Sequence, residues 1–535
     1  MPETFPLTLF VVSLAVAIDL FAMSLLRSRA RSRLRTPEDV RIFGQYSPIL
    51  TSVKKSTRAL RHSVRGVYTV GLELVREAFA DETQRMKLSV ALACTFSSIF
   101  IGLAFARSTD VNGWQLWTWL AGILVLTAAL VPPVRISLNR TWILPGVLFF
   151  SALALRLPRL ETVPGGLHVD EMGVAGFSLR HLYFLPGLTL NPFGFGPSSH
   201  PALYHYIIRL TLDLFGETIS ALRSSSAVVG SLGVVATYAL IAVLSDRRTA
   251  LFTSVLMAGY HYHVHWSRIA LNNIWDTLWV PLMLAAFAYG WKKGWSGGAV
   301  FSGLAFGFSQ YFYPGSRIGF FLLVFLILWL WRQELSQKRR LTYLGKFILA
   351  SVCVAAPLGL SSISNWEVFI GRARQTWGWS PEAIRVITGE NINIPRYLWH
   401  QITHSLGAYT VFADETGFYG PGIPFVIGLA APLFLIGFIW AVFNRKWLPV
   451  LWILLTAFFG GFLLGGNPSS SHFVVAIPAI CWLTALPLIW LYENGHPRWS
   501  IALLVVLLIT DLAFYFGVYV PGEPRDLIGA FPTDY

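Results

Sequence analysis

Charged residues are scarce in this sequence, and acidic residues are scarcer still. Only 13% of the 535 residues are charged, and 27 Asp and Glu stand against 41 Lys and Arg. Hydrophobic residues make up 55% of the chain, which excludes an ordinary soluble enzyme. The formal net charge of +14 could suggest nucleic acid, but in so apolar a chain it indicates basic loops on one side of a membrane. We expect no nucleic-acid partner.

Cysteine is almost absent. Cys94, Cys353 and Cys481 each lie within an apolar run. Their spacing shows neither a disulfide framework nor a cysteine-based metal site, so we expect small buried side chains. Tandem repeats are also not evident, which disfavours a transporter built from two recognisable inverted halves.

Long apolar runs are abundant, and each is near the ~20 residues that an α-helix needs to cross a bilayer. The sequence therefore predicts an all-α polytopic membrane protein with about fourteen transmembrane helices. The expected spans are Phe5–Leu26, Leu88–Ala106, Gln115–Val131, Trp142–Leu157, Ile219–Leu244, Thr249–Tyr262, Trp275–Tyr289, Gly297–Gln310, Ile318–Trp331, Leu344–Leu360, Ile423–Phe443, Trp447–Leu464, Phe473–Leu491 and Ser500–Val518.

Positive charge is distributed unevenly between the connecting loops. A basic segment (27–87) follows the first span, which lacks a signal-peptide cleavage pattern and is expected to be a retained anchor. Positive loops mark the cytoplasm, so the largest loops, about 158–218 and 361–422, should face outward and carry short helices at the membrane surface. One such helix is expected in the amphipathic run that ends at Phe215-Gly216.

This pattern divides the chain into two parts. Residues 1–140 form an N-terminal extension with about three spans, and residues 141–535 form the main membrane domain with the large outer loops.

Two adjacent carboxylates, Asp170 and Glu171, lie in a glycine-rich loop directly after the span Trp142–Leu157. Charges so close to a membrane segment are costly unless they face water or a cavity, which indicates function. A carboxylate here can act as general base on an acceptor hydroxyl. A metal, if one binds, would be a hard divalent ion near Asp170 or Glu171. The alternative is that both acids only solvate an outer loop.

Other outer loops hold side chains that suit a phosphate. Arg317 opens a span on the outer side, at headgroup depth, where a guanidinium can bind phosphate oxygens in fork geometry. Arg268 follows the histidines His261, His263 and His265, which would share a zinc site only on an extended backbone. The alternatives are arginines that reach lipid phosphates, histidines in interfacial hydrogen bonds, and Trp and Tyr residues in an interfacial belt.

Several short segments resemble the protein O-mannosyltransferase and aminoarabinose transferase superfamily, which are integral-membrane glycosyltransferases of the GT-C fold. The similarity covers about Trp142 to the C-terminus, and the first three spans lie outside it. The segments that carry it, in chain order, are Asp170-Glu171, His200-Pro201-Ala202-Leu203-Tyr204, Ala221-Leu222-Arg223-Ser224, Ser267-Arg268, Tyr311-Phe312-Tyr313-Pro314-Gly315-Ser316-Arg317 and His472-Phe473-Val474-Val475-Ala476-Ile477-Pro478.

The resemblance implies a GT-C-like fold and a reaction at the outer face of the plasma membrane. A sugar would pass from a polyprenyl-phosphate donor to a lipid, glycan or protein acceptor, with Asp170 as catalytic base and Glu171 orienting the acceptor or a metal. The donor phosphate would contact His200, Arg268 and Arg317. Further candidates for donor or acceptor binding are His265, Asn272, Tyr313 and His472.

One departure from the family pattern follows the Ser267-Arg268 segment. Many relatives have an acidic residue there, whereas this chain has Asn272-Asn273, and its nearest acid is Asp276. The departure weakens the expectation of metal dependence and keeps a catalytically silent member of the fold as an alternative. A transporter or flippase of lipid-linked saccharides is the other alternative, but it should carry its charges near the midplane of the spans.

Overall fold

The computed structural model describes residues 69–70, 73, 81–107, 114–133, 140–181, 191–196, 199–332, 336–389, 391–414, 416, 418–420, 422–466 and 468–522. The first predicted span and nearly all of the basic segment 27–87 lie outside these residues.

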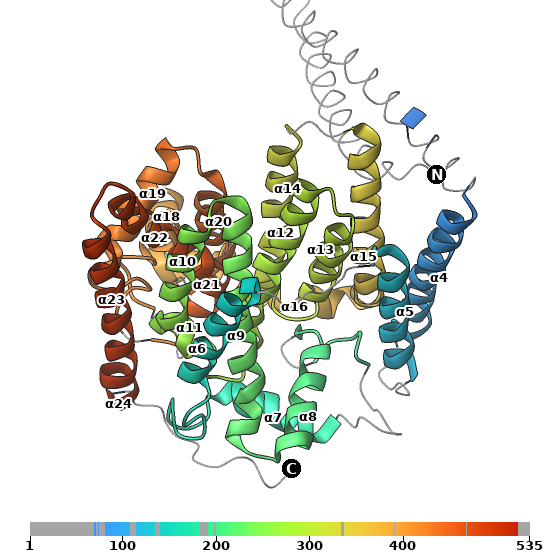
Figure 1. Cartoon of the computed structure of the whole chain (residues 1–535). Helices are drawn as coiled ribbons and strands as arrows, with labels where there is room; N and C mark the ends of the chain where they lie inside the picture. The colour runs from blue at the N-terminus through green and yellow to red at the C-terminus, as the bar shows by residue number, and fades with distance from the viewer. Residues whose placement is uncertain are drawn as a thin grey trace, which may run out of the picture.

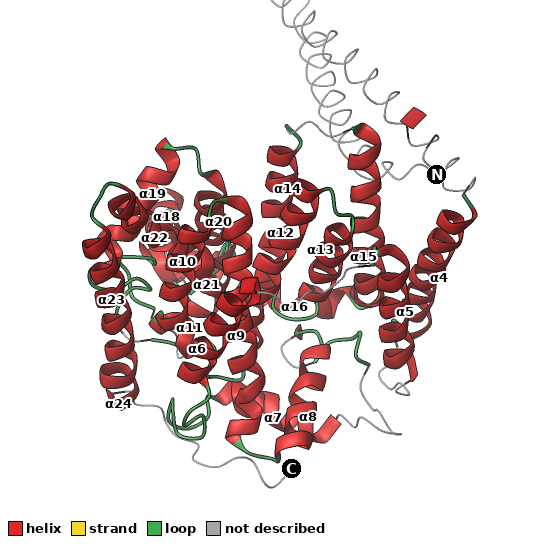
Figure 2. Ribbon diagram, viewed as in Figure 1, coloured by secondary structure: helices red, strands yellow, loops and turns green. Residues whose placement is uncertain are grey.

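The described residues form helices and connecting loops, with isolated β-bridges but no strand among them (Figure 2). The predicted all-α class is confirmed there. The α-helices are α4 (Glu82–Phe105), α5 (Trp114–Leu130), α6 (Ile143–Arg156), α7 (Val169–His181), α8 (Leu203–Phe215), α9 (Ile219–Leu244), α10 (Arg247–Gly259), α11 (His261–Trp266), α12 (Asp276–Lys293), α13 (Gly297–Ser309), α14 (Ile318–Leu330), α15 (Gln337–Ser364), α16 (Trp366–Thr376), α17 (Pro381–Thr388), α18 (Ile394–Gly407), α19 (Ala430–Phe443), α20 (Trp447–Ala457), α21 (Ser470–Phe473), α22 (Ile477–Glu493), α23 (Pro497–Ala513) and α24 (Val520–Gly522).

Short helical turns of other types continue or connect these helices. The 3-10 turns are η1 (Arg140–Trp142), η3 (Asn272–Trp275), η4 (Pro314–Arg317) and η6 (Val474–Ala476). Two π-helical turns, η5 (Phe458–Phe462) and η7 (Phe514–Tyr519), follow α20 and α23.

Five described helices are long and apolar enough to cross a membrane, which confirms a multi-pass membrane protein. They are Glu82–Phe105, Ile219–Leu244, Gln337–Ser364, Ser470–Glu493 and Pro497–Gly522. A sixth candidate is α19 with α20 and η5, two apolar helices bent by 119°. Further apolar helices in this part of the chain are shorter than a full span. The count of about fourteen spans stays a prediction.

Side-chain caps fix where several helices begin. Asp81 accepts a hydrogen bond from the N–H of Thr83 at 2.8 Å, and Asp246 accepts from the N–H of Thr249 at 2.9 Å. Thr218 caps α9 at the end of the predicted outer loop. Each cap satisfies backbone donors that the first helical turn leaves without a partner.

Glycine allows the central helices to pack closely. A Cβ at Gly303 of α13 would lie 2.3 Å from the carbonyl oxygen of Phe347 in α15, and one at Gly307 would lie 2.5 Å from Val354. The two glycines are four residues apart and therefore share one face of α13. Small residues at this spacing let helix backbones approach each other within a membrane.

The N-terminal extension packs on the main domain through α15. The indole nitrogen of Trp119 in α5 donates to the carbonyl oxygen of Cys353 at 3.2 Å. In Figure 1, α4 and α5 lie at one side of the molecule and α23 at the opposite side, while α7 and α8 lie together at one end. That end holds the Asp170-Glu171 loop.

Candidate functional site

The two carboxylates of the Asp170-Glu171 pair lie in the first turn of α7 but have different surroundings. Asp170 is exposed, whereas Glu171 is fully buried. The N–H of Asp170 donates to Nδ1 of His168 at 3.1 Å, and the His168 ring lies 5.0 Å from the ring of Phe418 in the second large outer loop. Asp170 is therefore the carboxylate of the pair that solvent can reach.

Glu171 anchors the loop to α9. Its two oxygens accept hydrogen bonds from Nε and Nη2 of Arg223 at 2.8 and 2.9 Å, and further bonds from the N–H groups of Ala270 and His168. Burial raises the pKa of Glu171, but the charge and hydrogen bonds of Arg223, together with the backbone hydrogen bonds from Ala270 and His168, hold that pKa below its usual value. These four bonds occupy the carboxylate, so in this geometry it is not open to a cation.

Arg223 and Arg268 hold the first outer loop by its main chain. Besides Glu171, Arg223 donates to the carbonyl oxygens of Leu160 and Pro164 at 3.0 and 2.9 Å. The Arg268 guanidinium, predicted to contact the donor phosphate, donates at 2.6–3.2 Å to the carbonyl oxygens of Leu155, Arg156, Pro158 and Val163. Arg268 thus satisfies the last carbonyls of α6 and fixes the path of the chain towards Asp170.

His200 lies in a tight turn, where its carbonyl accepts from the N–H of Gly196 at 2.7 Å. The imidazole stacks on the ring of Tyr313, with centroids 5.9 Å apart and planes inclined by 24°. Burial, and then the charges of Arg372 and Arg317, lower the pKa of His200 to about 4. The ring is therefore neutral at pH 7, and an anion among these groups would favour its protonated form.

Arg317 is the last residue of the turn η4, and its side chain packs against other parts of the protein. Its guanidinium carbon lies 5.0 Å from the centroid of the Phe369 ring. Asp276 is fully buried at the start of α12, near Arg317. A Cβ at Gly315 would lie 2.2 Å from the Asp276 carboxylate, so the turn can approach this carboxylate only with glycine there. Asp276 is the nearest acid after the Asn-Asn segment, and its carboxylate lies against the turn that carries Arg317.

Arg372 is a cation of the site that sequence reasoning did not single out. It lies on α16, one helical turn after Phe369, in a loop without a recognisable motif. The helix packs on the turn that carries His200, because a Cβ at Gly371 would lie 3.1 Å from Oγ of Ser199. From α16 the charge of Arg372 acts on His200, Tyr313 and His472. The packing of α16 on the His200 turn is what shows that Arg372 belongs to the site.

Asn272 and Asn273 link the loops around these side chains. The Asn272 amide donates at 3.3 Å to the carbonyl oxygen that precedes Tyr313, and the Asn273 amide donates at 2.9 Å to the carbonyl oxygen that precedes His472. The departure from the acidic family pattern therefore places two amide donors where they hold Tyr313 and His472 on adjacent loops.

The histidines of residues 261–265 do not face one common site, although two of them contact the same tyrosine. The segment is helical, and all three rings are buried. His261 pairs with the hydroxyl of Tyr419 at 2.6 Å, His263 with Nη2 of Arg156 at 2.8 Å, and His265 stacks on Tyr419 at 4.3 Å. His265 thus packs under the second outer loop. Within the described residues, no group of three or more His, Cys, Asp or Glu side chains could hold a metal ion.

Five side chains from four separate segments gather at this end of the helices, and we call them the cationic cluster. Two guanidinium groups, two imidazoles and a phenol offer hydrogen-bond donors, which suits a phosphate. The exposed carboxylate of Asp170 lies on the neighbouring loop, which Glu171 ties to the chain just before Asn272. The members of the cluster are His200, Tyr313, Arg317, Arg372 and His472.

Comparison with known families supports the resemblance inferred from the sequence. Residues 199–359 match the family model described as dolichyl-phosphate-mannose-protein mannosyltransferase. This segment includes His200, Asp276 and Arg317. No curated protein matches the chain.

Several solved structures with a similar fold are membrane glycosyltransferases. AglB of Archaeoglobus fulgidus, an oligosaccharyltransferase solved with an inhibitory peptide and dolichol-phosphate, is 12% identical with a TM-score of 0.43 over 72% of this chain and 56% of that one. ArnT of Cupriavidus metallidurans, bound to undecaprenyl phosphate, is 17% identical with a TM-score of 0.40 over 68% and 62%. The S. cerevisiae Pmt1-Pmt2 complex, bound to its sugar donor, is 18% identical with a TM-score of 0.32 over 50% and 39%.

These structural likenesses are partial, and this chain spans little more than half the length of the archaeal enzyme. The similarity to known families therefore rests on the match to the mannosyltransferase family model. Over residues 199–359 the chain is similar to the family of dolichyl-phosphate-mannose-protein mannosyltransferases, as the sequence predicted.

Proposed function

We propose that this protein is a membrane glycosyltransferase that moves a sugar from a polyprenyl-phosphate donor to an acceptor hydroxyl at the extracytoplasmic face. The observation that carries the proposal is the cationic cluster, together with an exposed carboxylate on a loop that Glu171 ties to the segment before Asn272. The match to a family of lipid-phosphate-dependent mannosyltransferases supports the same donor class.

The donor phosphate would lie among His200, Arg317 and Arg372. Arg317 ends the turn that opens an apolar helix, Pro314–Leu330, so its charge lies at the depth of a lipid phosphate. Arg372 approaches from α16, a separate segment of the second outer loop, which lets two guanidinium groups bind one phosphate. Neutral His200 can add a hydrogen bond or, once the anion is bound, a third charge.

Asp170 would act as the general base. As the acceptor oxygen attacks the anomeric carbon, Asp170 takes the hydroxyl proton, and the bond between that carbon and the phosphate oxygen breaks. The polyprenyl phosphate leaves with the electron pair, and the arginines stabilise its charge. Glu171 and Arg223 act by holding Asp170 in place rather than by touching the reactants.

The acceptor would be a lipid, a glycan or a protein. The second outer loop would select among these acceptors. We propose that the site faces the extracytoplasmic side of the plasma membrane. The reason is that the basic loops, which mark the cytoplasmic side, connect the opposite ends of the helices. No step in this mechanism needs a metal ion.

The proposal is tested by measuring transfer from radiolabelled polyprenyl-phosphate sugars in proteoliposomes. Wild-type protein should consume at least one such donor. Arg317→Gln and Arg372→Gln should each lower kcat/KM by about tenfold or more, because a hydrogen bond to a charged group contributes roughly 1.5–3 kcal/mol. Donor binding should weaken in parallel.

Arg374→Gln is the matched control. Arg374 lies on the same helix, is largely exposed and pairs with Glu367, away from the cluster. Its loss should leave transfer within twofold of wild type, since exposed ion pairs contribute little. Folded wild-type protein that consumes no donor, or an Arg374 variant as impaired as the Arg372 variant, would contradict the proposal.

A further inference from the structure

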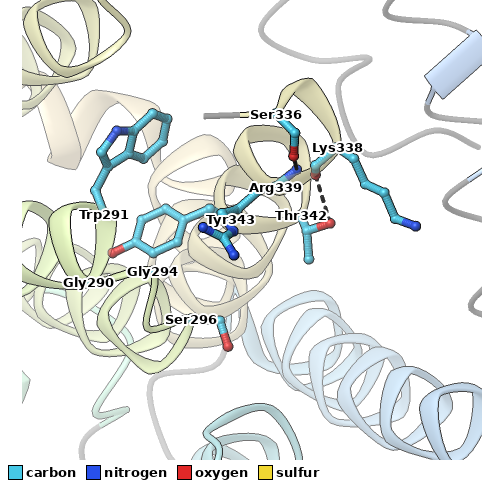
Figure 3. Close-up of a pocket in the computed structure, with 9 residues that line it drawn as sticks. All are labelled: Gly290, Trp291, Gly294, Ser296, Ser336, Lys338, Arg339, Thr342 and Tyr343. Atoms are coloured by element: carbon cyan, nitrogen blue, oxygen red, sulfur yellow. Dashed lines mark hydrogen bonds between the residues drawn. The ribbon is translucent and has the colours of Figure 1, made fainter. Parts of the chain in front are cut away.

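The cavity between the end of α12 and the start of α15 has a volume of about 340 Å³, and Figure 3 shows the side chains that line it. The Lys338 side chain points away from the cavity. The Tyr343 hydroxyl donates to the carbonyl oxygen of Phe287 at 2.9 Å, and Oγ of Ser336 accepts from the N–H of Arg339 at 3.3 Å. These contacts belong to the junction of the two helices, and we assign no ligand to this cavity.

The second outer loop, in contrast, holds a buried carboxylate whose contacts lead to the candidate site. Asp414 is 1% exposed. One of its oxygens accepts hydrogen bonds from the N–H and the hydroxyl of Thr416, at 2.8 and 2.6 Å. The other oxygen accepts from the N–H of Ser470 at 2.9 Å. Because Ser470 comes 56 positions later, this last bond ties the second outer loop to a separate segment of the chain.

The segment that Asp414 holds carries His472, a member of the cationic cluster. Ser470 opens the short helix α21, and His472 lies two residues further on. The charge of Arg372 acts on His472. Ser470 is fully buried, so water cannot readily replace Asp414 as the acceptor. Without Asp414, the N–H of Ser470 would lack a partner or the segment would have to move.

Two other side chains hold the same segment by its carbonyl groups. The hydroxyl of Tyr262 in α11 donates to the carbonyl oxygen of Ser470, and the amide of Asn273 donates to the carbonyl oxygen of Ser471 at 2.9 Å. Both are donors, so neither can take the place of an acceptor. Asp414 therefore supplies a contact to this segment that Tyr262 and Asn273 do not provide.

The loop of Asp414 also packs against the segment of the proposed base. The ring of Phe418 lies 5.0 Å from the ring of His168, whose Nδ1 accepts from the N–H of Asp170 at 3.1 Å. The carbonyl oxygen of Phe418 accepts from Nε2 of His265 at 2.9 Å, which fixes the loop from below. One loop thus contacts both the segment of Asp170 and the segment of the cationic cluster that begins at Ser470.

We propose that Asp414 is a positioning residue for sugar transfer, which holds His472 where the donor phosphate binds. It acts through the N–H of Ser470 rather than by contact with the donor. A carboxylate suits this role because both of its oxygens accept hydrogen bonds, and three donors converge on Asp414. An asparagine would keep one acceptor and turn N–H groups towards one of these donors. The link to the donor rests on the proposed function, whereas the hold on Ser470 does not.

The first test is hydrogen exchange, measured by mass spectrometry on the purified full-length protein in detergent. In Asp414→Asn, the N–H of Ser470 should exchange about tenfold faster or more, because the buried donor loses its acceptor. Thr416→Val removes one donor to Asp414 and is the milder change, so exchange should shift in the same direction by a smaller factor. Unchanged exchange at Ser470 in both variants would overturn the proposal.

The second test measures the affinity for undecaprenyl phosphate and for dolichyl phosphate by titration calorimetry. Asp414→Asn should weaken the binding of at least one of them by about fivefold or more. In a protein that already carries His472→Gln, the same substitution should change affinity by less than about twofold, because residues that act through one contact are not additive. A loss by the same factor in both backgrounds would overturn the proposal and indicate a general effect on the fold.

Glu382→Gln is the matched control. Glu382 is an exposed acid of the same outer loop, at the start of α17. Its substitution should leave the exchange of Ser470 and the affinity for both polyprenyl phosphates at wild-type values, and an equal change in this control would contradict the proposal. Wild-type protein that binds neither lipid would contradict the proposed function and the role of Asp414 in donor binding. Hydrogen exchange would still decide, in that case, whether Asp414 holds the segment of His472.

Discussion

At the residue scale, four arginines near the site differ in what they contact. Arg223 and Arg268 donate to acceptors of the first outer loop, whereas Arg317 and Arg372 lie among rings of the cationic cluster. A guanidinium whose donors are used by backbone carbonyls has none left for a phosphate. Motif similarity predicted Arg268 and Arg317 as equivalent phosphate ligands. It could not separate them, because nothing in the local sequence shows where the carbonyls at the end of α6 lie.

The lowered pKa of His200 predicts that donor binding depends on pH. The free protein keeps this imidazole neutral down to about pH 4, and a bound phosphate would raise its pKa by adding negative charge. Binding then takes up a proton, so donor affinity should rise as the pH falls from 7.5 towards 5, by up to tenfold per unit. The polyprenyl-phosphate sugar is a phosphodiester, so its own charge is constant over this range. Titration calorimetry of donor binding at several pH values measures the effect.

His200→Gln provides the comparison for this pH dependence. Glutamine keeps a hydrogen-bond donor but cannot gain a charge. Donor affinity of the variant should be flat between pH 7.5 and 5. A variant that follows the wild-type pH profile would place the titrating group elsewhere and contradict the role given to His200.

At the scale of elements, helices with a clear periodic pattern were predicted well and the helix that completes the site was not. The amphipathic run ending at Phe215-Gly216 is α8, and it stops at Gly216, whose φ of +87° suits glycine. The helix α16 mixes apolar, acidic and basic residues without a motif, and none of its residues is fully buried. Its place on the His200 turn is set by tertiary contacts, which composition does not encode.

The close approach of α13 and α15 predicts a strong effect of one methyl group. Gly303→Ala would place Cβ against a backbone carbonyl of α15, which cannot yield as a flexible side chain would. Overpacking of this kind costs typically about 1–3 kcal/mol, so the Tm should fall by several degrees. Thermal unfolding in detergent measures the shift.

Gly122→Ala is the matched control for this packing. Gly122 lies within α5, and a Cβ there would meet no atom within 4 Å. Its substitution should leave the Tm unchanged or slightly higher, since alanine favours a helix over glycine. Equal Tm values for the two variants would contradict the close α13–α15 contact.

At the scale of the whole molecule, the residues of the candidate site come from segments far apart in the chain. Asp170 lies in the first turn of α7, and Arg317 of the cationic cluster lies near Asp276 at the start of α12. The sequence predicted the membrane class and singled out the carboxylate pair, because hydropathy and charge are local properties. It could not show that one carboxylate of the pair is exposed and the other buried, because the partner Arg223 lies 52 residues further along the chain.

The central claim is that Asp170 acts as the base in sugar transfer, and the most direct test separates donor binding from turnover. We would measure both for Asp170→Asn in proteoliposomes, with Asp213→Asn as the control, because Asp213 pairs with Arg209 on α8. The account predicts that Asp170→Asn binds donor like wild type but transfers sugar at least about 100-fold more slowly, the usual scale of general-base catalysis. The control should keep its transfer rate. Transfer by Asp170→Asn at the wild-type rate would contradict the account.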